Sequence, residues 1–109
     1  MIRGDTIVAI SSVAASAARI IVRSSGGQSH AALRALAGVG DIAPRSARRV
    51  QLRFDGLALP ACVYVFAAPA SYTGEDLVEY HIPGNVWLAR RLVEELVRLG
   101  ARPAEPGEF

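Results

Sequence analysis

A hairpin signal in the middle of the chain constrains the fold most strongly. Over Ala47–Phe54 apolar and polar residues alternate, which is the pattern of a strand with one face buried. Asp55 and Gly56 follow as a strong short turn signal. The apolar segment Leu57–Ala67 comes next, and Pro60 within it indicates a strand edge or a bulge. We therefore predict two antiparallel strands joined by a tight turn.

The remaining segments predict further short strands and two helices. Three segments rich in β-branched or apolar residues are predicted as strands: Thr6–Ile10, Arg19–Arg23 and Leu77–Ile82. Two segments with apolar residues at helical spacing are predicted as helices: Gln28–Ala37, which Gly38 ends, and a helix that runs from an Asn85 N-cap to about Leu99. Small residues connect the first two strands over Ser11–Ala17, and the tail Ala101–Phe109 is predicted to be extended. This order predicts an α+β fold, a two-layer sandwich in which two main helices cover one face of a mixed, mostly antiparallel sheet.

Length and composition set the class of protein. The 109 residues suit a single domain, and 51% hydrophobic with 20% charged residues excludes a disordered chain. No apolar run reaches the roughly 18–20 residues that span a membrane, and the N-terminus does not read as a signal peptide. The one cysteine, Cys62, excludes an internal disulfide and fits a reducing compartment. We expect a cytoplasmic protein without membrane contact.

The charged residues argue against several functions. All 12 basic residues are arginines, which we ascribe to biased nucleotide composition, and the net charge of +2 does not by itself indicate nucleic-acid binding. The chain has no phosphate-binding Gly-x-x-x-x-Gly-Lys loop and no Gly-x-Ser-x-Gly elbow. We therefore predict no catalytic residues within this chain.

Two features are candidates for binding. The loop Ser71–Asp76 gathers hydroxyls, a glycine and two acids, and it is either a surface turn bonded to local backbone or a binding loop. Glu79 lies within an apolar strand, where a carboxylate needs a partner such as Arg23 or Arg19. A structural salt bridge and a ligand-binding acid are both open for Glu79.

Other chemically notable residues favour structural roles. Two histidines are too few for a metal site, so none is predicted; His30 is expected on a helix surface and His81 facing solvent. Cys62 is expected to be a small core residue rather than a nucleophile. Trp87 lies off the apolar stripe of its helix, where it either caps the core or meets a partner.

Four segments, in this order, carry a resemblance to a known family: Asp5–Ala9, Arg23–Gly26, Pro69–Asp76 followed by Glu79, and Ala104–Phe109. They resemble the N-terminal domain of the tRNA modification GTPase family MnmE, also called TrmE. The Ser-Tyr-Thr-Gly-Glu-Asp and Glu-Pro-Gly-Glu-Phe blocks are the specific parts of the match. The resemblance implies that residues 1–109 are one domain, similar to the folate-binding domains of the glycine-cleavage T-protein.

The family resemblance also implies partners and cofactors. In the family this domain binds a one-carbon tetrahydrofolate, in a formyl or methylene form, and forms a homodimer. With the FAD-dependent protein MnmG, the family modifies the wobble uridine of tRNA. GTP, magnesium and potassium would bind in a GTPase domain inserted into a helical domain, neither of which this chain contains. Whether the chain by itself is an enzyme stays open.

Arg23 and Glu79 match two folate-contacting residues of the family. A carboxylate can accept two hydrogen bonds from the donor edge of a pterin, and an arginine can meet carbonyl or glutamate oxygens. Two segments depart from the family pattern: Val13–Ala17 replaces a Pro-Pro-Gly-Arg-Gly-like connector, and Pro83–Asn85 replaces His-Gly-Gly. Lost glycines remove places where backbone approaches a ligand closely. The alternative is therefore an assembly-only dimerisation module with a degenerate pocket.

Overall fold

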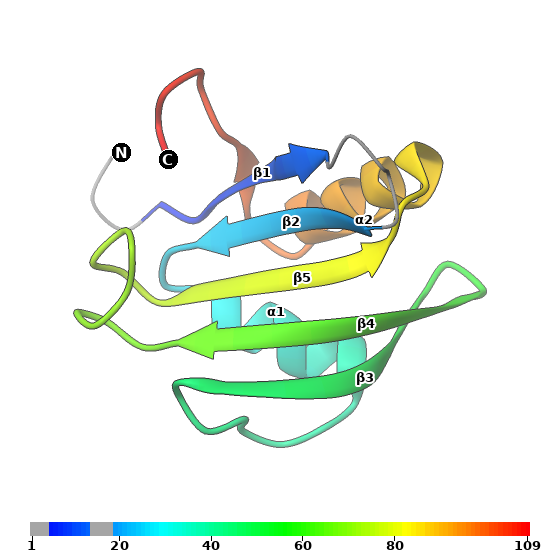
Figure 1. Ribbon diagram of the computed structural model, residues 1–109, viewed down its shortest axis with the longest axis horizontal. Coiled ribbons are helices and arrows are strands. Elements are labelled where there is room, and N and C mark those ends of the chain that lie inside the picture. The colour runs from blue at the N-terminus through cyan, green and yellow to red at the C-terminus, as the bar shows by residue number, and fades with distance from the viewer. Residues whose placement is uncertain (1–4, 14–18) are drawn as a thin grey trace.

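One six-stranded sheet organises the molecule, and the computed structural model describes residues 5–13 and 19–109. The strands are β1 (Ile7–Val13), β2 (Arg19–Ser25), β3 (Ser46–Phe54), β4 (Leu57–Phe66), β5 (Leu77–Pro83) and β6 (Arg102–Pro103). They lie side by side in the order β3-β4-β5-β2-β1-β6 (Figure 1). Only β1 and β6 pair in parallel, so the mixed, mostly antiparallel sheet is confirmed.

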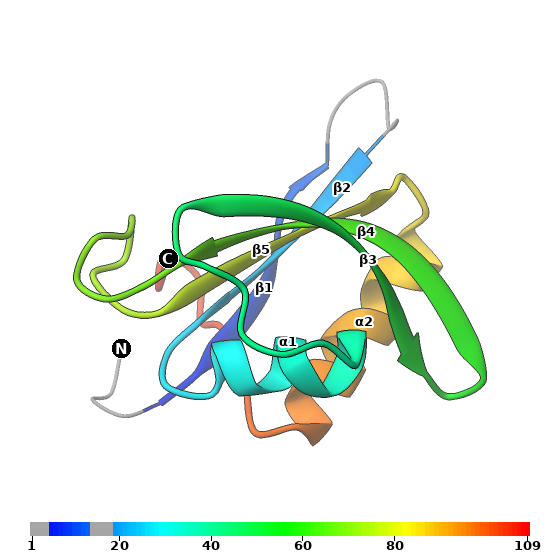
Figure 2. The ribbon, with the colours of Figure 1, turned by 90° about the horizontal axis from the view of Figure 1, so that it is seen from below.

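Both helices, α1 (Ser29–Ala37) and α2 (Val86–Arg98), cover the same face of the sheet (Figure 2). The Asn85 side chain accepts a hydrogen bond from the Leu88 amide at 3.1 Å, which confirms the predicted N-cap of α2. Gly38 ends α1 in the left-handed conformation, with φ 65°. In the described residues, neither helix is long and apolar enough to cross a membrane. The predicted two-layer α+β sandwich is confirmed.

Strand alternation divides the sheet into a covered face and an open face. Side chains on the covered face are fully buried against the helices: Val22, Leu52, Leu59, Val63, Val78, Tyr80 and Ile82, packed with Leu92 and Leu96 of α2. Each buried side chain of this size contributes about 1.5–3 kcal/mol to stability. No helix covers the other face, so the candidate site residues on that face stay accessible.

The predicted hairpin is confirmed as β3 and β4. Asp55 and Gly56 join the strands with φ of 51° and 75°, and positive φ at both residues characterises the turn that matches strand twist. Pro60 pairs with Gln51 of β3, while the ladder to β5 begins only at Cys62. On that side Pro60 therefore lies at a local edge, where its missing N–H removes no hydrogen bond to β5.

Two segments at the edge of the sheet beyond β2 have more strand structure than the sequence predicts. Strand β1 runs to Val13 and has an irregularity between Ile10 and Ser12, while the rest of the connector, residues 14–18, lies outside the described residues. The tail is extended, as predicted, only as far as Glu105, because a turn follows in which the Glu108 amide donates to the Glu105 carbonyl at 3.0 Å. Arg102 also donates its amide to the Thr6 carbonyl at 2.8 Å and so forms β6. A two-residue strand that contains proline has no periodic signal to reveal it.

Candidate ligand site on the open face

Arg23 and Glu79 face each other across β2 and β5. They are direct partners in the ladder, and both point to the open face because their neighbours Val22 and Tyr80 are buried on the other. Arg23 Nη2 lies 2.7 Å from Glu79 Oε2, and Arg23 Nε donates to the same oxygen at 2.9 Å. The side chains are 22% and 19% exposed. The predicted carboxylate partner is thus Arg23, in a half-buried, charge-assisted pair.

The pair leaves bonding capacity for a ligand. Arg23 Nη1 makes no hydrogen bond to the part of the chain that the structure describes, because Nε and Nη2 supply the contacts to Glu79. The guanidinium carbon lies 5.5 Å from the ring centre of Tyr72, which is 73% exposed. A cation under an exposed aromatic ring forms a surface on which a flat, polar ring can stack.

His81 orients the other side of the carboxylate. Arg19 Nη1 can only donate, so its 3.3 Å contact makes His81 Nδ1 an acceptor. His81 Nε2 then carries the proton and faces Glu79 Oε1 at 3.4 Å, a long contact that leaves this oxygen lone pairs to offer. The Tyr64 ring packs against the imidazole with 4.5 Å between centres. His81 points to the open face, but the expectation that it faces solvent is wrong, because Tyr64 and Arg19 leave only 12% of its side chain exposed.

The loop from residue 67 to 76 is bonded to its surroundings and places Tyr72. Asp76 Oδ1 accepts from the Ala68 amide at 2.8 Å, and Thr73 Oγ1 lies 2.7 Å from Ser25 Oγ. These bonds include the local backbone contact expected of a surface turn. The same bonds also hold Tyr72 beside Arg23, so the turn and binding interpretations of the loop are compatible.

His30, on α1, contacts both ends of this loop. Its Nε2 donates to the Phe66 carbonyl at 2.9 Å, and its Nδ1 lies 3.8 Å from Asp76 Oδ2. His30 was expected on a helix surface, yet its side chain is only 25% exposed because this end of β4 covers it.

A cavity of about 400 Å³ opens beside Arg23 and Tyr72. Its other walls are β1 at Ala9, Ile10 and Ser11 and the tail from Ala104 to Phe109. Glu79 is not among the lining residues; it adjoins the cavity through Arg23, whose guanidinium its Oε2 binds. The volume falls within the roughly 300–1,000 Å³ of small-molecule sites.

Arg102 anchors the tail that forms one cavity wall. Its Nε donates to Asp5 Oδ2 at 2.8 Å and its Nη1 to Glu108 Oε1 at 2.9 Å. These hydrogen bonds raise the pKa of Arg102, and the bonds from Arg102, followed by the Glu105 amide, lower the pKa of Glu108 to about 2. The tail wall is therefore a structured part of the fold.

The lowered pKa of Glu108 predicts a stability effect with a defined pH window. Because its folded pKa lies below its unfolded value, its contribution is complete above about pH 5 and is lost as the pH falls toward 2. Glu108→Gln should therefore lower the thermal midpoint at pH 6, and the difference from the unchanged chain should shrink toward pH 2. Glu105→Gln is the matched control, with no such pH dependence expected. A midpoint difference for Glu108→Gln that is constant across this range would contradict the role of the carboxylate.

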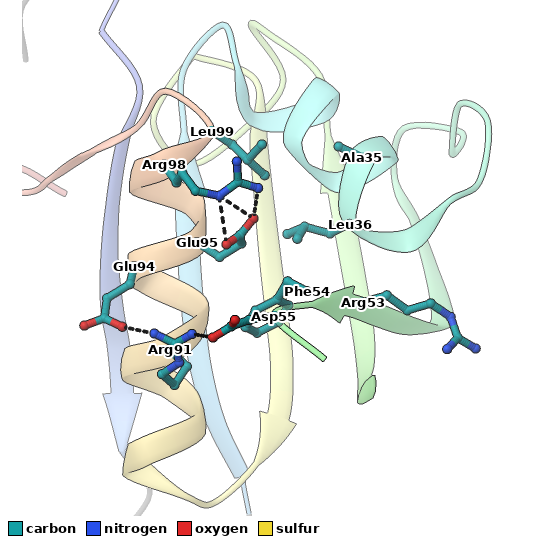
Figure 3. Close-up of a pocket in the computed structure, with 10 residues that line it drawn as sticks. All are labelled: Ala35, Leu36, Arg53, Phe54, Asp55, Arg91, Glu94, Glu95, Arg98 and Leu99. Carbon is teal, nitrogen blue, oxygen red and sulfur yellow. Dashed lines mark hydrogen bonds and ion pairs between the residues drawn. The ribbon is translucent and has the colours of Figure 1, made fainter. Parts of the chain in front are cut away.

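A second cavity, of about 500 Å³, lies between the two helices and the β3–β4 turn (Figure 3). Here Arg91 pairs with Asp55 and Glu94, and Arg98 pairs with Glu95 (Figure 3). The acidic side chains of this cavity are thus all paired with its own arginines, so we place the candidate site on the open face instead.

Cys62 and Trp87 lie away from the Arg23 cavity. Cys62 is half-buried on the open face, directly opposite His81, so the expectation of a core residue is wrong. The segment around it is apolar on both faces and gives no signal of which face is covered. Trp87 is 59% exposed at the start of α2, as its position off the apolar stripe predicts.

Sequence reasoning missed the supporting residues of the site. The contact of His81 with Glu79 was not predicted, and neither were Phe109 as part of the cavity wall and Arg102 as its anchor. Arg19, an expected alternative partner of Glu79, contacts His81 instead. For His81 a signal was available, since residues 79 and 81 of one strand share a face. The sequence gives no signal for the contacts of the tail, because Arg102 and Asp5 are about one hundred positions apart.

Comparisons with known proteins find similar sequences over almost the whole chain. The family model described as GTP-binding protein TrmE N-terminus matches residues 6–109. The chain belongs to the TrmE N-terminal family. It is 46% identical over 112 residues to the tRNA modification GTPase MnmE of Paramagnetospirillum magneticum, and 43% identical to the proteins of that name from Caulobacter vibrioides and Phenylobacterium zucineum. Each alignment covers 96% of this chain and 24% of the relative, so the TrmE N-terminal chain spans about a quarter of their length.

Pro83–Asn85, one of the two segments expected to depart from the family pattern, lies at one end of β5. Pro83 pairs with Arg19 at the start of β2, next to the connector of which residues 14–18 lie outside the described residues. Asn85 caps α2. Glu79 and Pro83 are four residues apart, or about 13 Å along a strand. Pro83–Asn85 therefore lies away from the Arg23 cavity.

Proposed function

We propose that this TrmE N-terminal domain binds a one-carbon tetrahydrofolate at Arg23 and Glu79 and pairs with a second copy of itself. The observation that carries the proposal is the Arg23–Glu79 pair, with a free guanidinium nitrogen, beside a cavity walled by Tyr72 and the tail. Membership of the family supports the same assignment.

The chemistry of the residues fits this cofactor. Glu79 Oε1, which Arg23 leaves free and which His81 meets only by a long contact, can accept from the donor edge of a pterin, and Arg23 Nη1 can donate to a carbonyl or to the glutamate carboxylate. Tyr72 provides an exposed ring on which the pterin can stack. The folate would supply a one-carbon unit. Within this chain the residues bind and orient the cofactor, with His81 and Arg19 as positioning residues.

The wider role follows the family resemblance, and the relatives named tRNA modification GTPase MnmE support its coarser part. The domain would be one part of a cytoplasmic GTPase that modifies the wobble uridine of tRNA together with FAD-dependent MnmG. GTP, magnesium and potassium would bind in parts of the longer relatives to which this chain does not align. This wider role belongs to the whole protein. Experiments on this chain alone can test the site on the open face.

Calorimetry with 5-formyltetrahydrofolate tests the site. Glu79→Gln keeps the size of the side chain but removes its charge, so affinity should fall about 10- to 100-fold, the equivalent of one charge-assisted hydrogen bond. His81→Gln should give a smaller loss, because it acts through Glu79. Glu94→Gln, an exposed acid on α2, is the matched control and should bind like the unchanged chain.

Two other results would change the proposed function. Equal affinity of Glu79→Gln and the unchanged chain would remove Glu79 from the site. No binding heat, together with a stable dimer in sedimentation that ignores folate, would favour the assembly-only module. Circular dichroism of each variant separates loss of binding from loss of fold.

A further inference from the structure

The arginines without carboxylate partners are concentrated on one strand. Eleven of the 12 arginines lie within the described residues, Arg3 being outside them. Five pair with carboxylates: Arg23, Arg34, Arg91, Arg98 and Arg102. Of the other six, four lie on or directly before β3: Arg45, Arg48, Arg49 and Arg53. We call these four the β3 arginines. The small net charge of the whole chain therefore conceals a local excess of positive charge.

The acidic side chains that lie near β3 are paired with arginines of the helices. Glu94 and Glu95 line the same cavity as Arg53, but they bind Arg91 and Arg98. Asp55 is the sole acidic residue between Asp41 and Glu75, and it pairs with Arg91 of α2. Asp41 pairs with Arg34 of α1. Figure 3 shows the Arg53 side chain pointing away from Asp55 and from the ion pairs of α2.

The geometry arranges the β3 arginines along an accessible edge. β3 is the terminal strand of the sheet (Figure 1), and all four side chains are exposed. Arg49 and Arg53 share the open face, since Leu52 and Phe54 are buried on the other, while Arg48 extends from the opposite side of the strand. From Arg45 to Arg53 the backbone covers about 26 Å at 3.3 Å per residue. The outer edge of β3 also presents unpaired backbone N–H groups, which can donate to phosphate oxygens.

We propose that the β3 arginines are a docking surface for the phosphate backbone of an RNA duplex. None of the exposed large hydrophobic side chains in the described residues lies on β3. Such a linear array of arginines suits an evenly charged polyanion better than a protein surface, whose binding centres on buried aromatic groups. RNA is chosen because the relatives are named as tRNA-modifying proteins, and in this respect the inference rests on the proposed function. The surface is separate from the Arg23 cavity, whose walls are β1, Tyr72 and the tail.

Fluorescence anisotropy with a labelled RNA stem-loop tests this inference. Neutralising four phosphate contacts gives a slope of about −3 to −4 in log affinity against log salt, which is about a 100-fold loss between about 50 and 200 mM salt. Replacing all four β3 arginines with glutamine should remove most of that slope. Arg49→Gln with Arg53→Gln, a milder change, should remove about half. Arg90→Gln, an exposed arginine on α2 without a carboxylate partner in the described residues, should leave the slope unchanged.

Three results would overturn the proposal. The first is that the chain does not bind the RNA at low salt. The second is that the β3 substitutions leave the salt dependence of the affinity unchanged. The third is that Arg90→Gln reduces this salt dependence as much as the β3 substitutions do. A four-arginine variant that aggregates while the double variant keeps its RNA affinity would show that the charges only protect a sheet edge. Folate affinity measured on the same variants should not change, so failure here and failure of the folate site are distinguishable.

Discussion

Gly26→Ala is expected to lower the free energy of unfolding by about 2–6 kcal/mol. Gly26 has φ 133°, a conformation that costs other residues about 1–3 kcal/mol. A Cβ at this position would also lie 2.3 Å from the Asp5 carbonyl oxygen and 2.6 Å from Thr6 Cα, both backbone atoms. The backbone would have to shift, at a further cost of about 1–3 kcal/mol.

The location of Gly26 extends the effect to the candidate site. Its amide donates to the Asp76 carbonyl at 2.8 Å, and its neighbour Ser25 contacts Thr73 in the loop that carries Tyr72. A shift at Gly26 should therefore loosen that loop and weaken ligand binding in any variant that folds.

Urea unfolding measures the loss, with Gly27→Ala as the matched control. A Cβ on Gly27 meets no atom within 4 Å, and Gly27 does not have a positive φ of this kind, so a change within about 0.5 kcal/mol is expected. If the free energy of unfolding of Gly26→Ala lies within about 1 kcal/mol of that of the unchanged chain, which is the size of typical backbone effects, the backbone relieves the close contact without cost.

The elements of the fold that sequence reasoning predicted are those with a local physical cause. The β3–β4 hairpin depends on a turn with positive φ at Asp55 and Gly56, and α2 begins where Asn85 caps it. Such contacts lie within a few residues of each other, so the sequence displays them directly. β6 depends instead on backbone bonds to β1, almost one hundred residues away, which no local pattern expresses.

The candidate site was partly predictable for the same reason. The apolar strand around Glu79 indicated a carboxylate that needs a partner, and the nearby basic residues narrowed that partner to Arg23 or Arg19. Choosing between these requires the register of β2 against β5, which pairs Arg23 with Glu79 and Arg19 with Pro83. That register follows from the packing of whole strands in the core, so it emerges only with the fold.

Burial on the open face was the least predictable property. The exposure of His81 and Cys62 depends on side chains from neighbouring strands, such as Tyr64 on β4. A single strand pattern reports which residues share a face, but not how well that face is covered.

Tyr80→Ala is expected to be among the most destabilising substitutions in the core, whereas Tyr80→Phe should be neutral or stabilising. Tyr80 is completely buried on the covered face between Val22 and Val63, and removing its ring should cost about 3–5 kcal/mol. Its hydroxyl, however, has no hydrogen-bond partner among the described residues. Phenylalanine keeps the ring and removes a buried polar group whose desolvation costs about 1–3 kcal/mol.

Alkaline unfolding gives an independent measure of the same hydroxyl. Burial raises the pKa of Tyr80 above its ordinary value, so the unfolded chain ionises first. Its contribution to stability is therefore complete below about pH 10 and is lost as the pH rises further. Urea unfolding at pH 7 and pH 11 should show a larger loss for the unchanged chain than for Tyr80→Phe. A loss of more than 1 kcal/mol for Tyr80→Phe at pH 7 would instead indicate a buried water bonded to the hydroxyl, since that is the typical net contribution of one hydrogen bond.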